Sequence, residues 1–238
     1  MSSRWAPLVV VVACKGAPVA DAPVALPSAT AAVVTPKERV MLLLDMSSSM
    51  RAGLDDDVQT RFEGAKASVV TLIREHATTP IGLVLFGKDA RMVSPATMDH
   101  EAELTAVEAA TLGKTVNPNG TSLGRAIAAA DAALGDDHSP ARVVIFTDAH
   151  SGRADGASDD DAIGAARIAA SHGRRITIVQ VSTREVVSVE DGVDLFGKPR
   201  FDKVKLAVDR ELMDALAAAT GGRVLVKPSA ADLRRVVE

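Results

Sequence analysis

The sequence predicts an α/β domain with a mostly parallel central sheet and helices on both of its faces. From about residue 38 onward, short apolar runs alternate with segments in which apolar residues recur at helical spacing. The apolar runs are continuous, which is typical of strands that are covered on both faces. A chain of 238 residues with 47% hydrophobic and 24% charged residues has the composition of a globular protein with its own core.

The first strand is predicted at residues 40–44, where the sequence reads Val-Met-Leu-Leu-Leu. A second buried strand is predicted at 81–86, which reads Ile-Gly-Leu-Val-Leu-Phe. Further strands are expected at 143–146, 176–181 and 224–226. Because helical segments separate these runs, neighbouring strands are expected to be parallel.

The first helix is predicted at 61–76, where Phe62, Ala65 and Val69 recur at helical spacing. A second helix is predicted in the Ala-rich segment at 122–134, which precedes a glycine that can end a helix. Further helices are expected at 101–112, 160–171, 209–219 and 230–237.

Residues 184–208 depart from this alternation of strands and helices. Asp191-Gly192 lies between two alternating apolar segments, and Gly197-Lys198-Pro199 follows. An Asp-Gly pair in this setting favours a tight turn between antiparallel strands. We therefore expect an inserted hairpin or lid here, with its turn at Asp191-Gly192.

The amino-terminal segment has the features of a targeting signal. An apolar run follows Arg4 and ends at Cys14, the only cysteine. This arrangement resembles a bacterial lipobox, in which the cysteine is lipidated after cleavage, and it predicts a signal peptide at 1–13. Residues 14–37 are rich in Ala and Pro and are expected to form a tether to a domain at 38–238. The alternative is a buried first strand with an inert cysteine.

Composition and charge exclude several functions. The formal net charge of −4 gives no electrostatic drive toward nucleic acid, and five Phe with one Trp leave few stacking surfaces. One cysteine cannot form an internal disulfide or a cysteine zinc cluster. No apolar run reaches the roughly 20 residues of a membrane-spanning helix, so membrane contact is expected only through a lipid anchor.

Three polar residues directly after the first strand predict a cation site. Asp45, Ser47 and Ser49 alternate along the chain, so their side chains can converge in a loop that leaves the strand. A carboxylate and two hydroxyls are hard oxygen ligands, which suit Mg²⁺ or Mn²⁺ better than zinc. The alternative is that Asp45 caps a turn and the serines hold the loop.

The segment Asp-Met-Ser-Ser-Ser-Met at 45–50 resembles the metal-ion-dependent adhesion site of von Willebrand factor type A domains. That site adds a distant Thr and a distant Asp, which match Thr121 in Pro-Asn-Gly-Thr-Ser and Asp148 at the end of the predicted strand at 143–146. The resemblance covers about residues 38–238 and implies a Rossmann-like three-layer fold.

The resemblance also assigns roles within this set. It implies that Ser47, Ser49 and Thr121 coordinate Mg²⁺, or Mn²⁺ or Ca²⁺, through their hydroxyls. Asp45 and Asp148 are then expected to act mainly through bound water and hydrogen bonds. Three positions depart from the usual pattern, because glycine is common where this chain has Ser48, Asn119 and Ala149.

The resemblance further implies a non-catalytic module that binds a protein partner. An Asp or Glu of the partner would complete the coordination of the cation. With the predicted lipid anchor, the module is expected at the bacterial cell envelope. The alternative is a cytoplasmic subunit that docks onto an ATPase, a chelatase-like complex or a secretion assembly. A type A domain that has lost its metal is a further possibility.

Overall fold

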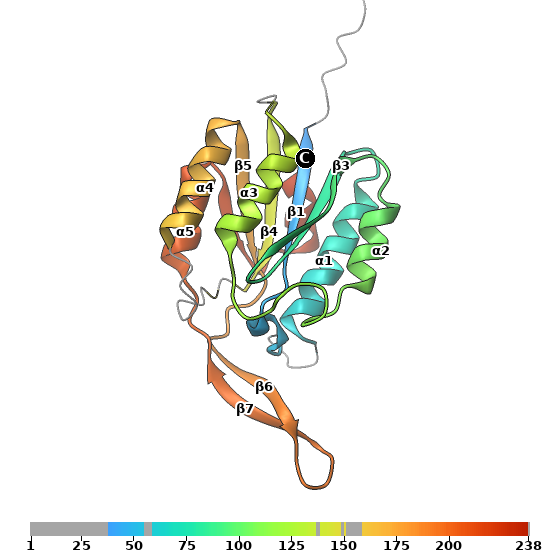
Figure 1. The fold of residues 1–238 in the computed structure, drawn as a ribbon, viewed down its shortest axis with the longest axis vertical. Helices are drawn as coiled ribbons and strands as arrows, with labels where there is room; N and C mark the ends of the chain where they lie inside the picture. Colours follow the sequence, from blue (N-terminus) through green and yellow to red (C-terminus); the bar gives the residue numbers. More distant parts are fainter. Residues whose placement is uncertain (1–37, 55–58, 137–138, 149, 151–158, 238) are drawn as a thin grey trace, which may run out of the picture. The chain divides into compact units, whose positions relative to one another are not determined.

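A computed structural model describes residues 38–54, 59–136, 139–148, 150 and 159–237. The predicted signal peptide, the tether and Cys14 lie outside the described residues. The main sheet contains β1 (Arg39–Asp45), β2 (Ile81–Phe86), β3 (Ala90–Thr97), β4 (Ala141–Thr147), β5 (Arg174–Gln180) and β8 (Arg223–Val226). Their order across the sheet is β3-β2-β1-β4-β5-β8, and every pairing except β2–β3 is parallel (Figure 1). The predicted α/β fold with a mostly parallel sheet is therefore confirmed.

The edge strand β3 was not predicted from the sequence. It pairs with β2 in the antiparallel direction, and the register shifts near Ser94. Arg91 and Met92 are exposed, and Pro95 cannot donate to a ladder. An edge strand tolerates these three residues, because one side of it pairs with no other strand. The sequence of β3 therefore lacks the continuous apolar character of the central strands.

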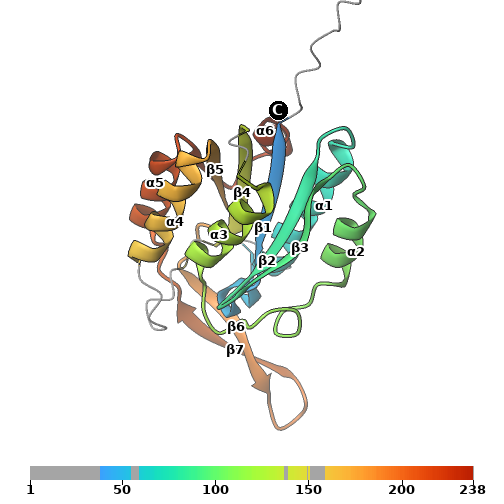
Figure 2. The same cartoon turned by 45° about the horizontal axis from the view of Figure 1, so that its top comes forward.

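The helices form a layer on each face of the sheet (Figures 1 and 2). They are α1 (Arg61–Glu75), α2 (Glu101–Ala109), α3 (Leu123–Leu134), α4 (Asp159–Ser171), α5 (Arg210–Ala219) and α6 (Ala230–Val237). Side chains of α1, α2 and α6 pack against Leu42 and Leu44 on one face. Side chains of α3, α4 and α5 pack against Met41 and Leu43 on the other. Because β1 is covered on both faces, residues 40–44 are fully buried.

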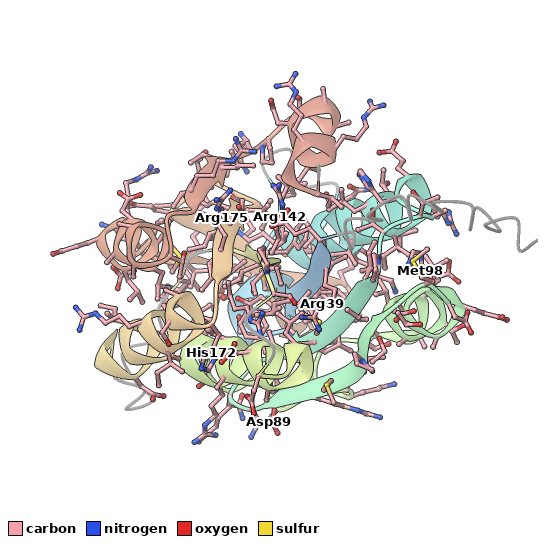
Figure 3. The ribbon with its side chains drawn as sticks, turned by 90° about the horizontal axis from the view of Figure 1, so that it is seen from above. Arg39, Asp89, Met98, Arg142, His172 and Arg175 are labelled. Carbon is pink, nitrogen blue, oxygen red and sulfur yellow. The ribbon has the colours of Figure 1, made fainter. Side chains whose placement is uncertain are left out.

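Arginines near the amino ends of the strands bind carbonyl groups of neighbouring segments. Arg39 Nη1 donates to the carbonyl of Leu134 (2.8 Å), and Arg142 Nη1 donates to that of Val236 (3.3 Å). Arg174 is buried and bonds the carbonyls of Gly135 and Ser139. Figure 3 looks onto this end of the molecule, where Arg39 and Arg142 are labelled. Such bonds satisfy the free carbonyls at helix carboxyl ends, so these arginines have structural partners.

A separate two-stranded sheet extends beyond the carboxyl ends of the parallel strands (Figures 1 and 2). It consists of β6 (Val186–Val193) and β7 (Pro199–Lys205), which are antiparallel and which we call the hairpin. The turn predicted at Asp191-Gly192 is wrong: Gly192 lies within β6, where the register shifts. The chain reverses at 194–198 instead, because the Asp194 carboxylate accepts from the amides of Phe196 and Lys198, both at 2.8 Å.

Candidate metal centre

The loop that leaves β1 brings two serine hydroxyls together. Asp45 is the last residue of β1, and its Oδ1 accepts a hydrogen bond from the Ser47 amide (2.8 Å). A 3-10 turn, η1 (Ser48–Arg51), then bends the chain. As a result, the hydroxyl oxygens of Ser47 and Ser49 are 3.1 Å apart. Asp45, Ser47 and Ser49 are all buried.

Asp148 joins this group from the adjacent strand. It directly follows β4, which pairs with β1 in parallel, so the two strands end at the same edge of the sheet. The Ser49 hydroxyl donates to Asp148 Oδ1 (3.2 Å), and the Thr147 hydroxyl donates to Asp45 Oδ2 (2.6 Å). Ordinary parallel strand pairing thus brings together carboxylates from residues about a hundred positions apart.

The loop that carries Thr121 is anchored to the end of β2 and to the serine loop. The Ser122 amide donates to the carbonyl of Gly87 (2.7 Å), and the Ser48 amide donates to that of Pro118 (2.8 Å). Gly87 has to be glycine, because an added Cβ would lie 2.3 Å from the carbonyl oxygen of Asn117. The loop therefore packs directly against the strand end next to the serines.

Gly120 gives this loop a conformation that other residues rarely adopt. Its φ is 141°, in the region open to glycine. Asn119, where the related motif has a glycine, donates its amide to the side chain of Asn117 (3.0 Å). The departure at Asn119 is thus accommodated, and the glycine that the backbone requires is retained directly before Thr121.

The predicted hydroxyl ligands line one cavity of about 530 Å³. Its walls come from the serine loop, the Thr121 loop, His150 and the hairpin. The lining residues are Ser47, Ser48, Ser49, Pro118, Asn119, Gly120, Thr121, His150, Val189, Val204 and Leu206. Asp45 and Asp148 are fully buried, and both are linked by hydrogen bonds to the serine loop. The structure thus brings the five predicted residues to one edge of the sheet.

Arg61 is a component of the site that the sequence analysis missed. Its guanidinium forms an ion pair with Asp148 (Nη1 to Oδ2, 2.5 Å), and both side chains are buried. Thr60 and Glu63 form a capping box that begins α1 at Arg61. The signal that could have found it is electrostatic: a cation in the first turn opposes the helix dipole and needs another partner.

The carboxylate of Asp45 has a strongly raised pKa. Complete burial raises it most, and the nearby negative charge of Asp148 adds to the effect, so that the pKa rises from 3.8 to about 7. Hydrogen bonds from Thr147 and Ser47 act in the opposite direction and are too weak to compensate. Among the described residues, these two carboxylates thus share a buried region with one guanidinium, that of Arg61.

The donor set and its spacing fit a small divalent cation. Mg²⁺ takes six oxygen ligands at about 2.0–2.1 Å, so adjacent ligands in an octahedron are about 3 Å apart. The observed separation of 3.1 Å between the hydroxyl oxygens of Ser47 and Ser49 matches this value. Within the described ranges, no group of three or more His, Cys, Asp or Glu is arranged to hold a metal, so this candidate depends on hydroxyls.

The fold and this loop arrangement define a class of protein. The family model of the von Willebrand factor type A domain matches residues 40–151, which begin in β1 and end beyond β4. The sheet and its flanking helices have the three-layer arrangement of this fold. The chain therefore has the α/β fold of von Willebrand factor type A domains, and residues 40–151 match the model of that family.

The chain is similar to bacterial proteins. It is 28% identical over 225 residues to a UPF0353 protein of Mycolicibacterium paratuberculosis, covering 89% of this chain and 63% of that relative. An aerotolerance-related membrane protein from Bacteroides fragilis has a similar fold, with a TM-score of 0.67 and 21% identity over 84% of this chain and 96% of the other. In this chain, no described helix is long and apolar enough to cross a membrane.

Two more distant structures of the same fold hold a metal ion. Proximal thread matrix protein 1 of the mussel byssus, described with a zinc-occupied adhesion-site motif, has a TM-score of 0.52 and 15% identity over 84% of this chain and 46% of its own. The manganese-loaded TRAP protein of Plasmodium vivax has a TM-score of 0.56 and 15% identity, over 85% of this chain and 72% of the TRAP chain. At these identities the likeness shows the fold alone.

The raised pKa of Asp45 predicts a pH dependence of stability when divalent ions are absent. The folded state keeps a proton up to about pH 7 that the unfolded chain loses near pH 3.8. The free energy of unfolding should therefore fall as the pH rises through this interval. Asp45→Asn should remove this contribution, as guanidinium unfolding in EDTA at several pH values would measure. Equal pH slopes in wild type and variant would contradict the assignment.

Proposed function

We propose that this protein is a non-catalytic binding module that holds a divalent cation at the candidate metal centre and uses it to bind an acidic residue of a protein partner. The observation that carries the proposal is the convergence of Ser47, Ser49 and Thr121 on one cavity, with Asp45 and Asp148 buried nearby. The cation would be Mg²⁺, with Mn²⁺ or Ca²⁺ as alternatives, since all three prefer oxygen ligands.

Charge at the site supports an acidic partner. The hydroxyls of Ser47, Ser49 and Thr121 are neutral, and none of the described residues that line the cavity carries a carboxylate. The buried ion pair with Arg61 already balances Asp148. A divalent cation beside Asp45 would therefore keep positive charge, and a carboxylate from outside would neutralise it in a partly desolvated setting.

We also propose that the module is held at the bacterial cell envelope by a lipid on Cys14, with residues 14–37 as its tether. The support is the lipobox-like sequence that ends at Cys14. Labelling with a fatty acid probe should mark the wild type and leave Cys14→Ser unmarked. Equal labelling of the two would exclude this anchor.

The binding function is tested by capture of a partner in the presence and absence of chelator. The immobilised protein should retain a partner from an extract of the source cells in Mg²⁺ and release it in EDTA. Thr121→Val should not retain it, because the change removes only a hydroxyl of the site, whereas Thr71→Val on the exposed face of α1 should behave as wild type. Retention that is indifferent to EDTA would contradict the proposal, and an ATPase subunit as the partner would favour the assembly alternative.

A further inference from the structure

The cavity at the metal centre has a second, apolar wall that the metal ligands do not provide. On one side lie the serine loop and the Thr121 loop, and on the other lie Val189, Val204 and Leu206. A volume of about 530 Å³ is far larger than a hydrated cation needs and is within the usual range of ligand pockets, about 300–1,000 Å³.

The strand register explains why this wall is aliphatic. Val187 pairs with Val204 across the hairpin, so Val187, Val189 and Val204 share one face. Val187 is buried, and Val189 and Val204 line the cavity. The other face carries Val186 and Phe201, which are exposed and do not line the cavity.

Contacts at its base hold the hairpin over the metal centre. Arg61, which pairs with Asp148, also donates from Nη2 to the carbonyl of Arg184. The ring Nδ1 of His150 lies 3.0 Å from the carbonyl oxygen of Ala207. Arg61 therefore contacts both Asp148 and the start of the hairpin, and His150, whose backbone amide donates to Asp148 Oδ1 (3.1 Å), contacts the end of the hairpin. These contacts place the apolar wall at a defined position beside the hydroxyls.

The rest of the hairpin is exposed in a way that is unusual for a folded domain. Nine large apolar side chains are exposed among the described residues, and five of them lie on the hairpin. Leu195 and Phe196 at its tip are 100% and 87% exposed. Concentrated apolar exposure of this kind typically marks an interaction surface.

We propose that the hairpin forms the second half of the partner-binding site and selects a protein segment in which an aliphatic side chain adjoins the acidic residue. The carboxylate would lie at the hydroxyl wall and the aliphatic group against Val189, Val204 and Leu206. The inference rests on the proposed function for the carboxylate and adds a specificity for its neighbour. Charge complementarity favours this occupant, because among the described residues the cavity lining contains no carboxylate and its hairpin wall consists of Val189, Val204 and Leu206.

Three acetylated and amidated peptides test the proposal with the full chain in saturating Mg²⁺: Gly-Glu-Leu-Gly, Gly-Glu-Ser-Gly and Gly-Gln-Leu-Gly. Binding is measured by titration with NMR detection. The Glu-Leu peptide should bind about tenfold more tightly than the Glu-Ser peptide, since burying an aliphatic side chain is worth about that factor. The Gln-Leu peptide should bind no more tightly in Mg²⁺ than in EDTA. The Glu-Leu peptide should lose its binding when EDTA replaces Mg²⁺.

Matched variants assign the preference to the cavity wall. Val189→Ser combined with Val204→Ser should reduce the Leu/Ser preference to less than about twofold. Val186→Ser combined with Phe201→Ser, on the outward face, should keep it. Val204→Ser alone replaces a side chain that is already 39% exposed, so it should fold normally and give an intermediate preference even if the double variant does not fold.

The possible outcomes separate the two proposals. If Glu peptides bind in Mg²⁺ without distinguishing Leu from Ser, the hairpin proposal is overturned and the proposed function stands. If no Glu peptide binds in an ion-dependent manner, both fail. If the wall variants instead weaken sedimentation with phosphatidylglycerol vesicles and leave peptide binding intact, the hairpin is a lipid contact and the proposal is likewise overturned.

Discussion

Replacement of Arg61 with Met is expected to lower the free energy of unfolding by about 3–5 kcal/mol in the absence of divalent ions. The physical reason is that Asp148 is fully buried and would lose the guanidinium that pairs with it at 2.5 Å. Methionine fills much of the same volume, so the effect reports mainly the lost charge and hydrogen bonds. Denaturant unfolding in EDTA measures it directly.

The matched control for this prediction is in the same helix. Arg74 pairs with Glu108 at 3.0 Å, but both side chains are more than half exposed. Arg74→Met should therefore cost less than about 1 kcal/mol. If the two substitutions lower the free energy of unfolding by similar amounts, burial does not strengthen the contribution of the Arg61–Asp148 pair. Added Mg²⁺ should stabilise Arg61→Met more than wild type, because a cation near Asp148 replaces part of the missing charge.

Binding of a divalent cation should stabilise the wild-type protein by about 2.7 kcal/mol when Mg²⁺ is present at about 100 times its dissociation constant. For a domain of this size, that corresponds to a rise in the melting temperature of roughly 5–10 °C. Thr121→Val should remove most of the rise, because it replaces a hydroxyl on the cavity wall with a methyl group of similar size. Thermal unfolding with Mg²⁺ and with EDTA gives both values.

Thr121 is a better probe than Asp45 for this purpose. Asp45 is fully buried and accepts hydrogen bonds from the Ser47 amide and the Thr147 hydroxyl, so Asp45→Ala would damage the fold as well as the site. Thr71→Val, on the exposed face of α1, is the matched control and should respond to Mg²⁺ as wild type does. If Thr121→Val gains the full stabilisation, the hydroxyl set is not the ion site.

Much of the fold could be predicted from short segments, because the signal for a buried strand is local. Residues 40–44 and 143–146 read as continuous apolar runs, and they form the adjacent central strands β1 and β4. The chain reversal in the hairpin was placed wrongly, because the preference of Asp191-Gly192 for a tight turn competed with the Asp194 side chain, which organises the observed turn. Two plausible local signals a few residues apart cannot be ranked without the strand register.

By itself, the sequence determined the class of the fold and the five oxygen-bearing residues of the candidate site. Its apolar periodicity reports burial directly, and Asp45, Ser47 and Ser49 lie within five residues of one another. Only the tertiary structure decided that Arg61 pairs with Asp148, that β3 is an edge strand of the sheet and that hairpin valines form a wall of the cavity. Those relations join residues far apart in the chain, and they depend on strand pairing and helix packing, for which no short stretch of sequence carries a signal.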